Sequence, residues 1–172
     1  RGDRIFVNGG LVHVGDDQRY VGHVIIGAHS VFRGDRALFN QRVDDAVAGA
    51  HDVLIEGQGS LGGAWGLSHP VRTLTITGLA DLYNASRIRV AESVHMLDRT
   101  ALGQTIRITS AIVTFDGTID RGAFATPGAL VVNGDAVFGG AIGAKHIIEF
   151  LKVTGRADLG AGEVWTRQYQ RY

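Results

Sequence analysis

The sequence has no cysteine and no long hydrophobic run, and each of these absences excludes a class of protein. Proline is also scarce, with only 2 copies. Without cysteine there is no disulfide scaffold and no thiolate metal site. No stretch reaches the ~18 apolar residues of a membrane helix, so we expect no membrane insertion. The 17 basic and 17 acidic residues cancel. Because nucleic acid requires a concentrated basic face, this even balance predicts no nucleic-acid partner.

Glycine is the residue in excess, with 25 copies among 172 residues. The apolar segments between the glycines are short and rich in β-branched residues, as in 74–77, 112–115 and 130–133. This composition favours strands over helices. Glycine, asparagine or aspartate ends most of these segments, which predicts tight turns between short strands. The one helix-like stretch, 44–50, is too short to count as a helix, and we interpret it as a loop.

Two repeats are nested in the chain. Residues 52–83 align with residues 129–160 at a shift of 77, and the alignment pairs Gly57 with Gly134 and His69 with His146. Outside this block the shift is 76, and the tripeptide Gln-Arg-Tyr at 18–20 returns at 170–172. A shorter shift of 21 operates inside each long repeat. A period of about 21–23 residues is typical of one turn of a strand solenoid.

We therefore predict a single all-β domain over residues 1–172, a parallel β-helix with rungs of about 21–23 residues and a long repeat of about 76. Repeat 1 covers about 9–84, repeat 2 about 85–160, and a third begins at 161–172. The alignment predicts two inward stacks and one outward row. The inward stacks are Val113, Ala136 and Ala157, and Phe115, Phe138 and Leu159. The outward row is Thr114, Val137 and Asp158.

Four segments, 112–120, 128–134, 136–143 and 151–155, resemble the repeats of large secreted β-helix adhesins of the filamentous-haemagglutinin and autotransporter-passenger type. The resemblance is best over residues 105–166 and fainter over 9–83. It implies a right-handed parallel β-helix, export to the cell surface, and adhesive or structural work without chemistry.

The carboxylate pairs are the best candidates for catalysis or calcium binding. They are Asp44 with Asp45, and Asp116 with Asp120. Paired carboxylates are what glycoside hydrolysis requires. However, Asp44 aligns with Asp120 in the long repeat, which indicates a structural turn role copied with the repeat. The seven histidines show no close metal-binding spacing. We predict no catalytic, cofactor or metal site.

Neither end of the predicted coil has an obvious polar cap, and unpaired strands favour further pairing. We expect the ends to contact other copies head-to-tail, or adjacent rungs of a longer parent chain. The predicted assembly contact is Ile5, Val7, Trp165, Tyr169 and Tyr172. Trp65 aligns with Ile142 and is expected in the core instead.

A lower-ranked hypothesis is a receptor loop at Arg33, Gly34 and Asp35, with a second Arg-Gly-Asp at 1–3. Such a tripeptide arises readily by chance in a chain rich in arginine and glycine. The function that the sequence favours is a non-enzymatic structural or adhesive segment of an extracellular or cell-surface fibre or adhesin, with itself, a host receptor or a glycan as partner. The alternative is a β-helix protein that binds or cleaves polysaccharide.

Overall fold

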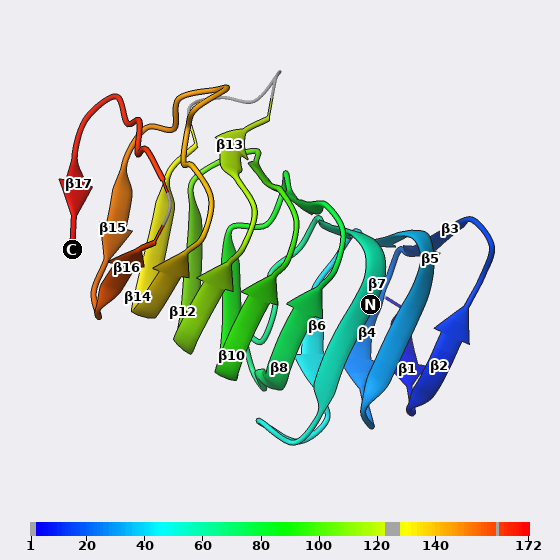
Figure 1. The fold of residues 1–172 in the computed structure, drawn as a ribbon. Coiled ribbons are helices and arrows are strands. Elements are labelled where there is room, and N and C mark those ends of the chain that lie inside the picture. The colour runs from blue at the N-terminus through cyan, green and yellow to red at the C-terminus, as the bar shows by residue number, and fades with distance from the viewer. Residues whose placement is uncertain (1–2, 123–127, 161) are drawn as a thin grey trace.

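The computed structural model describes residues 3–122, 128–160 and 162–172. In these residues parallel strands stack into a β-solenoid of about 8 turns (Figure 1). This confirms the predicted all-β, single-domain fold. No helix occurs in the described part of the chain, so none there is long and apolar enough to cross a membrane.

Each turn has three sides, which we name A, B and C in chain order. Side A carries β1 (Arg4–Val7), β4 (His23–Ile26), β6 (Val43–Asp45), β15 (Leu151–Val153) and β17 (Gln170–Arg171). Side B carries β2 (Gly10–His13), β8 (Val71–Ile76) and β16 (Ala157–Leu159). Side C carries β3 (Asp17–Tyr20), β9 (Ala80–Leu82), β11 (Thr100–Leu102) and β13 (Ile119–Arg121).

Five long strands bend around a corner and contribute to two sides. β5 (Ser30–Phe39) and β7 (Asp52–Leu61) pass from side B to side C, whereas β10 (Arg87–Met96), β12 (Ile106–Phe115) and β14 (Leu130–Phe138) pass from side A to side B. Single-residue bridges continue the remaining sides. Trp65 joins Val43 to Ile88 on side A, and Ile142 joins Ile119 to Val164 on side C.

The strand register confirms the predicted stacking. Val113 pairs with Ala136, which pairs with Ala157, and Phe115 pairs with Phe138, which pairs with Leu159. The length of a turn varies more than the predicted 21–23 residues. Val24 pairs with Val43, 19 positions on, whereas Ile108 pairs with Val132, 24 positions on. The variation arises because the connections at the corners differ in length.

The interior is one continuous hydrophobic column. Its largest side chains are Phe32, Phe39, Trp65, Phe115 and Phe138, all essentially buried. Phe115 and Phe138 stack with ring centroids 5.5 Å apart. Burial of this column stabilises the coil, because a single turn cannot cover its own apolar face. Leu159 continues the inward row but is exposed, because no strand among the described residues pairs beyond β16.

The long sequence repeat is not a whole number of turns. From Val43 on side A the chain returns to side A at Trp65, Ile88 and Ile108, completing three turns. It then crosses side B and reaches Ile119, the repeat equivalent of Val43, on side C. One long repeat is therefore three turns and two further sides. Equivalent residues consequently lie on neighbouring sides of the coil.

Candidate functional site

A buried aspartate caps an equivalent loop in each long repeat. Oδ1 of Asp44 in β6 accepts hydrogen bonds from the backbone N–H groups of Ser68 (2.9 Å) and His69 (3.3 Å). Oδ1 of Asp120 in β13 accepts from the N–H groups of Lys145 (3.0 Å) and His146 (3.1 Å). These carboxylates satisfy donors that would otherwise be unpaired next to a buried strand. This is the structural role that the alignment of Asp44 with Asp120 predicts.

The two capped loops share the same backbone conformation. Gly66 and Gly143 begin them, with φ of 66° and 72°, a region that favours glycine. A Cβ at Gly66 would overlap the carbonyl oxygen of Arg89, and one at Gly143 would overlap that of Trp165. Each loop therefore lies against the next turn too closely to admit a side chain at this position.

Beside each capped loop the surface is hollowed. The first cleft, on side A, has a volume of about 390 Å³. Its lining is Arg4, Phe6, His23, Ile25, Arg42, Asp44, Asp45, Ala46, Ser68 and His69. The second cleft, on side C, has a volume of about 160 Å³. Its lining is Arg99, Ala101, Asp120, Arg121, Gly122, Lys145 and His146. Because Asp44 and Asp120 are repeat equivalents, the second cleft is a duplicate of the first with substituted side chains.

In the first cleft the charges neutralise one another. Oδ2 of Asp44 accepts a hydrogen bond from Nε of Arg42, and Nε2 of His23 lies 2.9 Å from the same oxygen. Burial by itself raises the pKa of Asp44, but the hydrogen bonds from the Ser68 amide, Arg42 and the His69 amide outweigh burial and hold the pKa below its usual value. Asp44 therefore stays ionised, and both of its carboxylate oxygens already have hydrogen-bond partners within the cleft.

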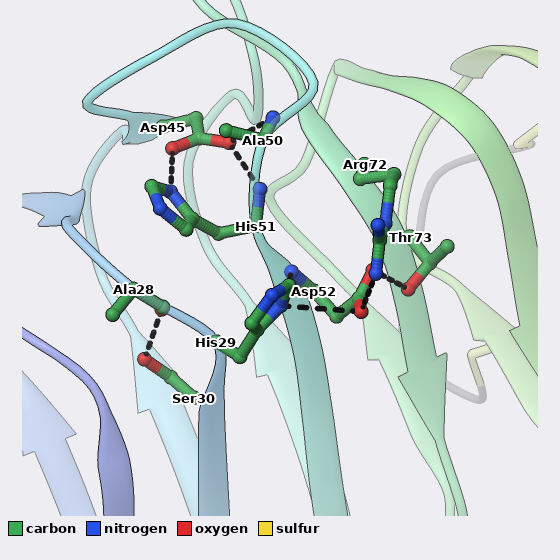
Figure 2. A network of polar contacts seen from close by, with 9 residues as sticks. All are labelled: Ala28, His29, Ser30, Asp45, Ala50, His51, Asp52, Arg72 and Thr73. Atoms are coloured by element: carbon green, nitrogen blue, oxygen red, sulfur yellow. Dashed lines mark hydrogen bonds and ion pairs between the residues drawn. The ribbon is translucent and has the colours of Figure 1, made fainter.

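A second polar network lies at the corner between sides A and B (Figure 2). Asp45, whose side chain is fully buried, accepts hydrogen bonds from the backbone N–H groups of Val47, Ala50 and His51, and Nδ1 of His51 lies 2.6 Å from its Oδ1. The carboxylate thereby closes the loop after β6. The stretch 44–50 predicted as a loop thus begins within β6 and becomes a loop after Asp45.

The same network continues to the next turns. Asp52 accepts hydrogen bonds from Nε of Arg72 (2.8 Å) and from the Thr73 hydroxyl (2.7 Å), and Nδ1 of His29 lies 3.2 Å from it. The Arg72 guanidinium, with help from Thr73, lowers the pKa of Asp52 to about 2 against the opposing effect of burial. Three successive turns are thus linked by polar side chains that are engaged with one another.

The His–Asp pairs are the feature that sequence reasoning missed. His23 pairs with Asp44 and His95 with Asp116, each 21 positions apart, and His29 pairs with Asp52, 23 positions apart. These separations equal one turn of the coil. A search for histidine and aspartate residues one period apart would therefore have found these contacts. Among the described residues, no group of three or more His, Asp or Glu is placed to hold a metal ion.

The first and last turns form the two ends of the coil (Figure 1), and the predicted assembly residues belong to these turns. Ile5 and Val7 belong to β1 and point inward, Ile5 partly buried and Val7 almost fully. Trp165, Tyr169 and Tyr172 lie at the other end and are about half exposed. Trp65, by contrast, is fully buried, as its alignment with Ile142 predicts.

The Arg-Gly-Asp tripeptide at 33–35 lies within the strand β5, not in a loop. The Arg33 guanidinium forms an ion pair with Glu56 on the next turn. A Cβ at Gly34 would contact the carbonyl oxygen of Asp16, so the backbone is held closely at this corner. Arg1 and Gly2 of the other copy lie outside the described residues. The receptor role stays a prediction.

The chain was compared with protein-family models, with curated proteins and with solved structures, and none of them matches it.

Proposed function

We propose that this chain is a non-enzymatic structural or adhesive element of an extracellular or cell-surface fibre, extended at its ends by further β-solenoid turns. One observation carries the proposal: exposed large hydrophobic side chains concentrate at the ends of the coil. Of the 14 such side chains among the residues that the structure describes, eight lie at the two ends. They are Phe6, Leu11, Val14 and Val21 at one end, and Leu159, Trp165, Tyr169 and Tyr172 at the other.

The backbone supports the same proposal. Within the described ranges, β1, β2 and β3 each pair with a strand on one edge only, as do β16 and β17 at the opposite end. Unpaired strand edges favour addition of a further strand, and apolar side chains beside them favour its burial. The two ends differ in shape, so contact between copies would be head-to-tail and would generate an open filament.

Electron microscopy of the purified chain over a range of concentrations, with light scattering for mass, tests assembly. We expect filaments, and we expect Trp165→Ser with Tyr169→Ser to shorten them. Tyr83→Ser is the matched control, because Tyr83 is an equally exposed aromatic residue away from both ends. Monodisperse rods at all concentrations would contradict self-assembly and assign the covering turns to a longer parent chain.

A second candidate function, polysaccharide binding, is favoured by a groove of about 340 Å³ on side C. Its lining includes the exposed ring of Tyr83, which can stack on a sugar, and the side chains of Asn40 and Asn84. Binding is favoured over cleavage, because Asp44 and Asp120 are buried and engaged with loop amides. Titration with neutral and acidic oligosaccharides tests this function, and no binding of either kind would contradict it.

A further inference from the structure

The second cleft differs from the first in charge. At equivalent positions, Arg99 replaces His23, Arg121 replaces Asp45, and Lys145 replaces Ser68. If the histidines are counted as neutral, the lining of the first cleft contains Arg4 and Arg42 with Asp44 and Asp45, so its net charge is zero. The second sets Arg99, Arg121 and Lys145 against Asp120 alone, a net charge of +2. Duplication preserved the loop geometry, whereas the side chains around it became cationic.

Two of the added cations, Arg99 and Lys145, are available for a ligand. Arg99 and Lys145 are exposed, and no carboxylate among the described residues lies within ion-pair distance of either. In the first cleft, Arg42 is instead engaged by Asp44 and the Ser68 hydroxyl. The one carboxylate in the second cleft, Asp120, accepts two backbone hydrogen bonds through Oδ1. Charges that converge on a hollow raise the local concentration of an oppositely charged group.

The groove beside Tyr83 adjoins the second cleft on side C. Asp81 in this groove pairs with Ala101 of the cleft, and Ala101 pairs with Asp120. Among the described residues, the side chains of Asn40, Tyr83 and Asn84 have no hydrogen-bond partner. These amide and phenol groups match the hydroxyls of a sugar. Neighbouring strands lie roughly 4.8 Å apart, so the cleft and the groove are within the reach of one short oligosaccharide.

We propose that side C binds an acidic oligosaccharide. An anionic group of the sugar lies in the second cleft against Lys145 and Arg99, and neighbouring sugar hydroxyls lie against Asn84 and Tyr83. Two unpaired cations neutralise too few phosphates for nucleic acid, and the amides of Asn40 and Asn84 suit sugar hydroxyls instead. This inference rests on the second candidate function, polysaccharide binding, and names the class of polysaccharide.

The test is calorimetric titration with a single-stranded DNA hexamer and three sugar probes: trigalacturonate, its fully methyl-esterified form, and a sulfated galactan tetrasaccharide. We expect at least one acidic probe to bind about tenfold more tightly than the neutral ester, and its affinity to fall with salt. The tighter acidic probe identifies the group as carboxylate or sulfate. A single-stranded DNA hexamer that bound more tightly than both acidic probes would overturn the proposal.

Variants locate the site. Arg99→His with Lys145→Ser, which installs the first cleft's residues, should weaken acidic binding about tenfold. Arg107→Ser removes an exposed arginine from side A and should leave it unchanged. An equal loss in both variants would indicate general charge attraction and overturn the site. If all sugars bind alike, the acidic site fails but polysaccharide binding survives, whereas no binding by any sugar refutes both. Filament formation is measured separately and is unaffected by either result.

Discussion

The two clefts are copies of one loop structure that differ in what surrounds the capping aspartate. In the first cleft, Asp44 accepts hydrogen bonds from two loop amides, and its other oxygen contacts Arg42 and His23. In the second, Asp120 accepts the two equivalent loop amides, and Thr118 stands in the place of Arg42. The comparison teaches that both copies of the repeat retain the backbone hydrogen bonds to the aspartate, whereas the charged side chains that line the cleft differ between the copies.

The loop glycines should give the largest effects. Gly66→Ala and Gly143→Ala each force a side chain into a positive-φ position against a carbonyl oxygen, so each should cost roughly 3 kcal/mol or more in unfolding free energy. Gly66 lies in the middle of the stack, and its change should loosen the whole coil. Gly143 lies near the last turns, and its change should open those turns alone.

Chemical denaturation and amide hydrogen exchange, read turn by turn, would distinguish these effects. Gly15→Ala is the control, because a Cβ there meets nothing within 4 Å and φ is not positive. Its effect should stay within about 0.5 kcal/mol. Equal loss of protection throughout the coil in both loop variants would contradict the prediction that Gly143→Ala opens the last turns alone.

The capping aspartates should give intermediate and unequal effects. Asn retains an oxygen that accepts the loop amides, so Asp120→Asn should cost less than about 1 kcal/mol. Asp44→Asn also loses the charged contacts with Arg42 and His23, and should cost about 2 kcal/mol. Thermal and urea unfolding measure the difference.

A background carrying Arg42→Thr, which copies the residue at 118, sharpens this comparison. In that background the cost of Asp44→Asn should fall toward that of Asp120→Asn, because the main charged partner is already absent. If the cost stays unchanged, Arg42 is not the source of the difference between the clefts.

The smallest effect is an acid sensitivity confined to the first repeat. The pKa of Asp52 is about 2 in the fold, below the usual 3.8, whereas its repeat equivalent is the uncharged Ala129. Its contribution is therefore complete above the usual pKa and is lost as the pH falls from there through about 2. Because the carboxylate is 34% exposed, solvent screening limits the effect to less than about 1 kcal/mol.

Comparison of the wild type with Asp52→Asn over this range of pH measures it. The wild type should be the more stable near neutral pH, and the difference should vanish near pH 2. A difference that persisted at the lowest pH would assign the effect to packing and not to the charge of Asp52.

Much of the fold followed from the sequence, because inward positions recur at one-turn spacing and must be apolar. The inward stacking of Phe115 on Phe138 and the burial of Trp65 were predictable in this way. The exposure of Leu159 was not, because it depends on which strands cover the last turn. The clefts could not be predicted from the sequence either. Asp120 and His146 align with Asp44 and His69, but nothing in the local sequence indicated that Arg99 would line the same cleft.

The sequence by itself determined the solenoid, its inward rows and the copying of the capped loop, since these depend on periodic apolar residues and on glycines at fixed positions. Only the tertiary structure decided that the copies lie on different sides. The long repeat is three turns and two further sides, so the second copy lies on side C, which adjoins side A. That placement brings the cationic cleft beside the groove of Tyr83, because side chains meet across turns and not along the chain.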